Sequence, residues 1–147
     1  RIEDKVYFTG YTNNPYKYVS RADIFVMPSL YEGFPNALAE AICMGKPCIA
    51  TDFPTGAREL LCPERIYNKD KVCKLELEEF GIITPLCSEK FFTDEPLEPE
   101  ELELAYAMSK LLEDATMRQY YSNKSIERSK TLDISTTVEK WLEYVEK

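Results

Sequence analysis

The fold is decided by the stretch Pro28-Ser29-Leu30-Tyr31-Glu32-Gly33-Phe34-Pro35-Asn36-Ala37-Leu38-Ala39-Glu40-Ala41-Ile42-Cys43-Met44-Gly45. It follows an apolar run at residues 23–27 and continues into an almost wholly apolar segment at residues 36–44. We interpret the run as a strand buried on both faces, and the segment as a helix closed by Gly45 in the C′ position. A strand, a loop and a helix in this order form the unit from which parallel α/β sheets are built.

Outward from this stretch, short β-like runs alternate with helical segments over the first half of the chain. We expect strands at residues 6–9, 23–27, 47–51 and 81–85. Helices are expected at residues 16–21, 36–44 and 55–61, and a loop at residues 87–99. The alternation predicts an α/β fold in which a Rossmann-like parallel sheet is flanked by helices, over one domain at residues 1–147.

The last third of the chain is predicted to be helical, at residues 100–113, 115–130 and 135–146, with Ser135 as an N-cap. Apolar residues recur at helical spacing in the first and last of these segments. The buried faces expected from that spacing are Leu104, Met108, Leu111 and Leu112 in the first, and Val138, Trp141, Leu142 and Val145 in the last.

Composition and charge exclude several classes of function. The 147 residues carry a net charge of −8, which provides no basic surface for nucleic acid. Acidic residues gather at 74–79 and 95–103, which we interpret as solvated surface. No apolar run approaches the roughly 20 residues that span a bilayer. The chain begins at Arg1 without a methionine or leader, and we therefore expect a fragment of a longer protein.

The cysteines indicate neither disulfides nor a metal site. The chain has five of them, no CxxC pair and no histidine, so a zinc ion would have only cysteines and carboxylates as ligands. Two lie inside predicted core elements, which is typical of reduced thiols in a cytoplasmic protein. The five are Cys43, Cys48, Cys62, Cys73 and Cys87.

The loop and helix start at residues 28–36 have the chemistry of an anion site. In open α/β sheets, ligands bind where such loops gather, beyond the carboxyl ends of the strands. A helix N-terminus offers backbone N–H groups and a partial positive charge to a diphosphate. Gly33 permits a close backbone approach, and Pro35 begins the helix without losing a needed donor.

Two acidic residues flank this helix start. Glu40 is the one ionisable residue between Ala37 and Met44, and its carboxylate needs donors, for which ribose hydroxyls are suited. The alternative is a partly exposed glutamate that interacts with the helix dipole. Glu32 precedes the helix, and its alternative is a solvated loop acid. The pairing of the two acids favours a binding role.

Glu32 and Glu40 form an E-x7-E motif that resembles the signature of family-4 retaining glycosyltransferases of the GT-B fold. The likeness covers nearly the whole chain. It includes residues 8–11, similar to the family's "F-x-G" strand end, residues 22–29, similar to its "A-D-v-f-v-x-P-S" strand, residues 45–52, similar to "G-x-P-v-i-a-t-D", and residues 58–61, 81–84 and 141–143. The resemblance implies the C-terminal, donor-binding domain of such an enzyme, truncated on its N-terminal side.

The resemblance also implies roles for individual residues. Glu32 would be the catalytic-site acid that holds hydroxyls of the donor sugar, and Glu40 would bind the ribose. The turn around the sugar and diphosphate would be made by Gly33, Phe34, Pro35, Asn36, Ala37 and Leu38. The base would lie near Gly10, Tyr11 and Thr12. Family enzymes need no metal-binding DxD motif and no cofactor, and they transfer the sugar with retention while stabilising the departing diphosphate.

Residues 52–59 resemble a version of the family motif found in transferases that build bacterial surface polysaccharides. This likeness favours a UDP-sugar over a GDP-sugar as the donor, and a hexosyl or N-acetylhexosaminyl group as its sugar. Within the segment, Arg58 either contacts a phosphate or faces solvent, and the segment as a whole is otherwise a helix-capping loop.

The family's domain begins two strands earlier, with a basic pair that grips the diphosphate. The sheet should therefore have an unpaired edge, so that either two copies associate there or the chain belongs to a longer one. The acceptor, a glycan or a lipid-linked precursor, would bind an N-terminal domain, and the parent would lie at the inner membrane face. We expect no sugar transfer by this chain alone.

Two other interpretations remain open at this point. In the first, the chain is a non-catalytic nucleotide-binding or interaction module. In the second, it belongs to another GT-B enzyme such as an inverting transferase or an epimerase. The second has less support, because those families do not resemble the arrangement of Glu32 and Glu40.

Overall fold

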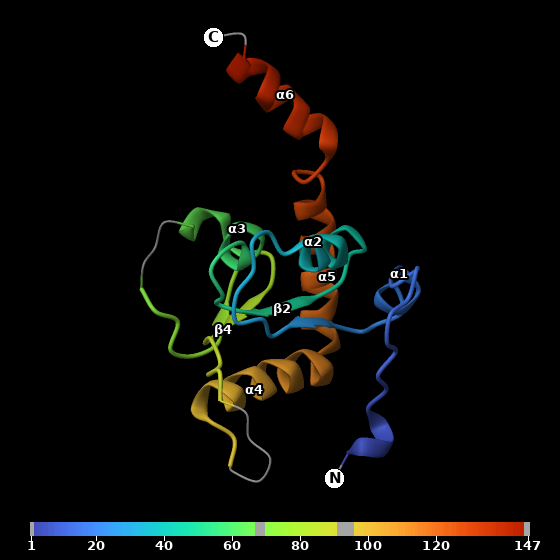
Figure 1. The fold of residues 1–147 in the computed structure, drawn as a ribbon, viewed down its shortest axis with the longest axis vertical. Helices are drawn as coiled ribbons and strands as arrows, with labels where there is room; N and C mark the ends of the chain where they lie inside the picture. The colour runs from blue at the N-terminus through green and yellow to red at the C-terminus, as the bar shows by residue number, and fades with distance from the viewer. Residues whose placement is uncertain (1, 67–69, 91–95, 146–147) are drawn as a thin grey trace.

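The computed structural model of the chain describes residues 2–66, 70–90 and 96–145 (Figure 1). Two short 3-10 helices, η1 (Glu3–Lys5) and η2 (Pro63–Arg65), accompany the main elements. The strands are β1 (Phe25–Met27), β2 (Cys48–Thr51), β3 (Glu76–Leu77) and β4 (Ile82–Thr84). The helices are α1 (Tyr16–Val19), α2 (Asn36–Cys43), α3 (Ala57–Leu61), α4 (Pro99–Glu113), α5 (Ala115–Ser129) and α6 (Ile134–Val145).

Across the described residues, the strands form one four-stranded sheet in the order β1-β2-β4-β3. β1, β2 and β4 run parallel, with Val26 opposite Ile49 and Ile49 opposite Ile82. β3 pairs antiparallel with β4. The parallel strands are joined by crossovers that contain α2 and α3, as the alternating pattern predicts. The predicted fold class, a Rossmann-like parallel sheet with flanking helices, is therefore confirmed.

The sheet separates two apolar layers (Figure 1). On one face, α2 and α3 bury Leu38 and Leu61 against Ala50 and Ile83. On the other face, α4 and α5 cover Ile49 and Ile82, with members that include Ala107, Leu111 and Tyr121. Neighbouring residues of one strand point to opposite faces, so Ile49 and Ala50 belong to different layers. This two-sided burial explains why β2 and β4 are apolar up to the threonine that ends each of them.

The predicted strand at residues 6–9 is wrong. The segment is irregular, and Tyr7 and Phe8 are 85% and 96% exposed. A strand needs a neighbour to accept its backbone hydrogen bonds, and the sheet of the described residues places β1 at its edge without such a neighbour. For the same reason β1 is half-buried rather than buried on both faces. Intrinsic β-propensity does not replace a partner strand.

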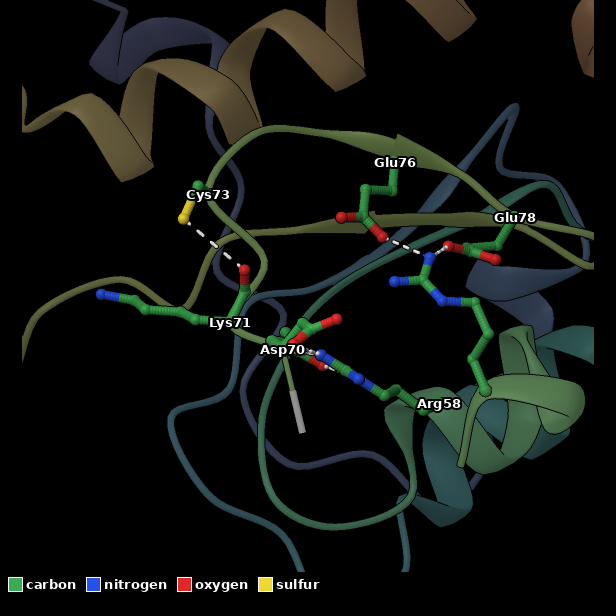
Figure 2. Close-up of polar contacts among 8 residues, drawn as sticks. Arg58, Asp70, Lys71, Cys73, Glu76 and Glu78 are labelled. Atoms are coloured by element: carbon green, nitrogen blue, oxygen red, sulfur yellow. Dashed lines mark hydrogen bonds and ion pairs between the residues drawn. The ribbon is translucent and has the colours of Figure 1, made fainter. Parts of the chain in front are cut away.

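The sequence pattern missed β3, which lies inside the acidic stretch interpreted as solvated surface. Arg65 of η2 holds this strand: its Nη1 donates to Glu76 Oε2 at 2.5 Å and also to Glu78. Figure 2 shows the carboxylates of Glu76 and Glu78 converging on one guanidinium group, which these two ion pairs identify as that of Arg65. Two of the acids are thus used to attach a short edge strand to η2.

The helices agree with the sequence in position but not in every buried face. In α4, Leu104 and Met108 pack on the core and Leu111 is buried, whereas Leu112 is 49% exposed and Ala107 takes its place. Ser135 is not the N-cap of α6, because that helix begins at Ile134 and Asp133 accepts a hydrogen bond from the Ser135 N–H. Gly45, with φ of +67°, follows the last turn of α2 as predicted. The loop expected at residues 87–99 lies partly outside the described residues.

The apolar face predicted for α6 is not buried in this chain. Its members are 49% to 75% exposed, and α6 extends from the end of α5 away from the sheet (Figure 1). They are Val138, Trp141, Leu142 and Val145. The helix is amphipathic by sequence, yet the described residues do not cover its apolar side.

Two loops pair at the carboxyl ends of β1 and β2. The Glu32 turn (residues 32–36) and the Thr55 loop (residues 52–56) are joined by backbone hydrogen bonds, from Glu32 N to Pro54 O at 3.1 Å and from Thr55 N to Glu32 O at 3.0 Å. Gly56 has φ of +99°, and a Cβ added there would lie 2.3 Å from Cδ of Pro35. The contact between the loops therefore requires glycine at this position.

Cysteine reactivity tests the burial of the core. The thiols of Cys48 and Cys62 are buried, and burial raises both pKa values, that of Cys62 to about 12. A raised pKa lowers the thiolate fraction at a given pH, and the thiolate is the reactive form. We expect iodoacetamide at about pH 8 to modify exposed Cys43 and Cys73 at least about 100-fold faster than Cys48 and Cys62. Peptide mass spectrometry over a time course measures the rates, and equal rates in the native chain would contradict this core.

A glycine pair tests the contact between the two loops. Gly56→Ala combines a disfavoured φ with a clash against the Pro35 ring, so we expect a loss of about 2–4 kcal/mol in the free energy of unfolding. The matched control is Gly45→Ala, where φ is +67° but the nearest atom is Cγ1 of the Ile126 side chain at 3.1 Å. This control should lose about 1–2 kcal/mol. Urea unfolding measures both, and equal losses would show that the loops do not pack as described.

Candidate functional site

The candidate site lies where the Glu32 turn, the start of α2 and the Thr55 loop meet. The two loops follow β1 and β2, which are parallel neighbours, so their carboxyl ends open on the same edge of the sheet. The side chain of Thr51, at the end of β2, donates to Ser29 O at 2.6 Å and ties the two strand ends together. The predicted site residues of the E-x7-E segment are thus brought to the edge where α/β sheets bind ligands.

Glu32 is half-buried and held from several directions. The hydroxyl of Ser29 donates to its Oε1 at 2.8 Å. Its own backbone N–H and C=O are both bonded to the Thr55 loop. The carboxylate therefore has a defined position at the mouth of the loop, with further lone pairs available to hydroxyl donors.

The turn after Glu32 exposes a short run of backbone. Gly33 is exposed and its carbonyl accepts a hydrogen bond from the Thr55 hydroxyl at 2.7 Å. Phe34 is 50% exposed, whereas Pro35 is buried beneath the turn. The N–H of Asn36 donates to Phe34 O at 2.9 Å. The turn is thus closed on itself and presents its outer surface to the sheet edge.

The first turn of α2 continues this surface. Asn36 and Ala37 are exposed, while the side chain of Leu38 is fully buried in the core. The N–H of Leu38 donates to Pro35 O at 3.0 Å. The side chain of Leu38 is therefore turned away from any ligand at this edge, and its backbone N–H is already bonded within the turn.

Glu40 lies one turn further along α2 and is half-buried. The hydroxyl of Tyr16, at the start of α1, donates to its Oε1 at 3.2 Å. This hydrogen bond and the negative charge of Glu40 raise the pKa of Tyr16. The phenol therefore stays a protonated donor at neutral pH. The bond links Glu40 of α2 to α1, and the second carboxylate oxygen of Glu40 is not part of it.

The residues predicted to lie near the base are in the exposed segment before α1. Tyr11 is 94% exposed, Gly10 has φ of +61°, and Thr12 accepts a hydrogen bond from the Asn14 N–H at 3.2 Å. Within the described ranges, no hydrogen bond joins residues 10–12 to the Glu32 turn or to Glu40. Hydrogen bonds in the described residues therefore do not join this group to the two acids.

Arg58 does not face solvent, which was one of its two alternatives. Its Nε and Nη2 donate to the two oxygens of Asp52, each at 2.7 Å. Nη2 also donates to the backbone oxygen of Asp70 at 2.7 Å (Figure 2). Its side chain is only 14% exposed. The hydrogen bonds to Asp52 raise the pKa of Arg58. A bidentate pair of this kind is well oriented, so Arg58 anchors α3 to the end of β2. The phosphate contact stays a prediction.

A hollow of about 380 Å³ lies beside this ion pair. It is lined by the Thr55 loop on one side and by residues such as Glu59, Ile66, Asp70 and Lys71 on the other. The side chain of Lys71 points away from Arg58 (Figure 2). The walls of the hollow carry charges of both signs, and the charges of Asp52 and Arg58 are already paired with each other.

Sequence reasoning did not single out three residues that bond directly to the predicted ones. They are Tyr16, Ser29 and Thr55. Ser29 and Thr55 lie within the motif segments quoted above, so their positions carried a signal. No sequence pattern indicated Tyr16, because its contact with Glu40 joins residues 24 positions apart.

Neither a metal centre nor a membrane span is found in the part of the chain that the structure describes. No three metal-ligating side chains gather closely enough to hold an ion among those residues. The helices in the same ranges are all too short or too polar to cross a bilayer.

Comparisons with known proteins agree with this geometry. Residues 1–74 match the family model described as glycosyl transferases group 1. An uncharacterized glycosyltransferase of Methanocaldococcus jannaschii is 38% identical over 144 residues, which cover 95% of this chain and 35% of that protein. The N-acetylgalactosamine-N,N'-diacetylbacillosaminyl-diphospho-undecaprenol 4-alpha-N-acetylgalactosaminyltransferase of Campylobacter jejuni is 30% identical over 132 residues, covering 90% of this chain and 29% of that enzyme.

Among solved structures, sucrose-phosphate synthase from Thermosynechococcus elongatus superposes with a TM-score of 0.67 at 23% identity. The alignment covers 99% of this chain and 30% of the synthase, and it supports the predicted GT-B fold. The chain spans about a third of the length of the curated relatives it matches. The family match covers the Glu32 turn, Glu40 and the Thr55 loop, so the chain belongs to the group 1 glycosyltransferases.

Proposed function

We propose that this chain supplies the nucleotide-sugar donor site of a retaining glycosyltransferase that acts in cell-surface polysaccharide biosynthesis. The observation that carries the proposal is the placement of Glu32 in the Glu32 turn and of Glu40 one turn into α2, at the carboxyl edge of a parallel sheet. A diphosphate bound at the start of α2 would meet the positive end of that helix, with one acid on each side.

Glu32 contacts the donor sugar in this proposal. Its carboxylate already accepts one hydrogen bond, from Ser29, and can accept more from sugar hydroxyls. The residues that surround the sugar and diphosphate are Gly33, Phe34, Pro35, Asn36, Ala37 and Leu38, the last through its backbone. A helix N-terminus that the loops hold in place needs little reorganisation when charge develops on the leaving diphosphate.

Glu40 binds the ribose. Tyr16 donates to Oε1, and an ionised carboxylate has about four lone-pair sites, so a vicinal diol can bind while the Tyr16 bond remains. The base then extends toward the segment of Gly10, Tyr11 and Thr12. Arg58 contributes to the diphosphate only if it exchanges its bond to Asp52, and we therefore place it second to the α2 N-terminus.

The donor we propose is a UDP-sugar in preference to a GDP-sugar, carrying a hexosyl or N-acetylhexosaminyl group. The C. jejuni relative, which is named an N-acetylgalactosaminyltransferase, supports this class of sugar and a diphospho-undecaprenol-linked acceptor. Transfer with retention needs no protein nucleophile when the acceptor attacks from the side of the leaving group, and neither a metal nor another cofactor is part of the proposal.

The acceptor and the rest of the catalytic cleft belong to a further domain in this proposal. The relatives are about three times as long as the part they share with this chain, which supports such a domain. The isolated chain then binds donor without transferring it, and the parent enzyme works in the cytoplasm at the inner membrane face. The alternative, a nucleotide-binding module without catalysis, shares the donor site and differs only in turnover by the longer protein.

Calorimetric titration of the chain with UDP and with GDP tests the donor site. We expect saturable binding of UDP, and a roughly 10- to 100-fold weaker affinity for Glu40→Gln, since a charged hydrogen-bond partner of the ribose is lost. The matched control is Glu113→Gln, an exposed glutamate at the end of α4, which should leave the affinity unchanged. Absence of binding to UDP, GDP and their sugar conjugates, or an equal effect of both variants, would overturn the proposed site.

A further inference from the structure

We propose that Thr55 is a positioning residue that sets the shape of the Glu32 turn, so that the Thr55 loop controls affinity for the sugar of the donor and not for its nucleotide. This inference rests on the proposed function. It concerns a residue outside the E-x7-E segment, and it follows from the contacts between the two loops.

The first observation is that the Thr55 loop bonds the Glu32 turn at consecutive residues. Two backbone hydrogen bonds link Glu32 to Pro54 and Thr55. The Thr55 hydroxyl adds a third, to the Gly33 carbonyl at 2.7 Å. Through Thr55 alone, the loop therefore controls the orientation of the peptide groups on both sides of Gly33.

The second observation is that Gly33 has little else to hold it. It is exposed, it has no side chain, and a Cβ added there would meet no atom within 4 Å. A glycine in such surroundings samples many backbone conformations unless hydrogen bonds restrict it. The Thr55 hydroxyl is the side-chain group placed to provide that restriction.

The third observation is that the Thr55 loop is itself rigidly attached to the sheet. The Asp52 N–H donates to Thr84 O at 2.8 Å, and Phe53 is only 3% exposed. At the other end of the loop, Arg58 bonds both oxygens of Asp52, and Gly56 lies against the ring of Pro35. The loop is fixed at both ends, so a hydrogen bond from Thr55 transmits that rigidity to the turn.

The separation between sugar and nucleotide follows from where Glu40 is held. Its hydrogen-bond partner is Tyr16 of α1, whereas the contacts of Thr55 are with Glu32 and Gly33. Loss of the Thr55 hydroxyl therefore frees the Gly33 carbonyl, next to Glu32 in the turn, while leaving the Glu40 carboxylate in place. A change in general stability would instead weaken every part of the donor alike.

The first test measures positioning without any ligand. Thr55→Val removes the hydroxyl at almost constant volume, Thr55→Ser retains it, and Thr116→Val is the matched control, because Thr116 lines a different hollow with Leu77 and Tyr120. We expect faster amide hydrogen exchange at Glu32 and Asn36, whose N–H groups are hydrogen-bonded in the turn, in Thr55→Val, with wild-type rates in Thr55→Ser and Thr116→Val. Unchanged exchange in Thr55→Val would overturn the inference, whatever the chain binds.

The second test measures the consequence for binding, with UDP and with UDP-N-acetylgalactosamine, UDP-N-acetylglucosamine, UDP-galactose and UDP-glucose as probes. For the sugar conjugate that the wild-type chain binds most tightly, Thr55→Val should weaken binding by about three- to tenfold, the effect of one hydrogen bond, with UDP itself unchanged. Thr55→Ser should restore the wild-type ratio. Equal losses for UDP and the conjugate would show a merely structural role, and a wild-type chain that binds none of these probes would refute the proposed function, leaving the exchange experiment to judge the positioning.

Discussion

The arrangement of this molecule depends on the parallel pairing of β1 with β2, which brings the ends of two strands to one edge of the sheet. Residues 22 positions apart, Gly33 and Thr55, become hydrogen-bonded neighbours there. Because side chains alternate between the faces of a strand, a shift of this register by one residue would turn Ala50 away from α2 and Ile49 toward it. The two apolar layers and the contact between the loops are therefore consequences of the same register.

Much of the fold is predictable from the sequence because β2 and β4 are buried on both faces and α2 ends at a glycine with positive φ. The errors arise where local preference needs a partner. Residues 6–9 have high β-propensity but no neighbouring strand, and α6 is amphipathic but uncovered within the described residues. β3 was missed because this two-residue strand is attached through the bonds of Arg65 to Glu76 and to the adjacent Glu78 rather than by an apolar pattern. Each of these three errors thus concerns an interaction between segments that are separate in the sequence.

The candidate site, too, is predictable from the sequence only in part. Glu32 and Glu40 stand out in the sequence as acids beside an apolar helix, and a family resemblance assigns them roles. The groups that hold them come from other elements: Ser29 from the end of β1, Thr55 from the next loop and Tyr16 from α1. Arg58 shows the limit most clearly, since the spacing of residues 52–58 does not reveal that its guanidinium group is already bound to Asp52. Spacing locates chemical groups, whereas their availability depends on contacts that only the folded chain provides.

The exposure of α6 has a spectroscopic consequence. Trp141 is the chain's one tryptophan, and it lies on the uncovered side of this helix at 66% exposure. Indole emission from the folded chain is therefore that of a largely hydrated ring, and unfolding of the sheet changes it little. A shift of that emission to shorter wavelength reports instead that something has covered α6. Tryptophan fluorescence of this protein therefore reports on its C-terminal helix. The core is better followed through tyrosine fluorescence, because Tyr121 is buried against the sheet.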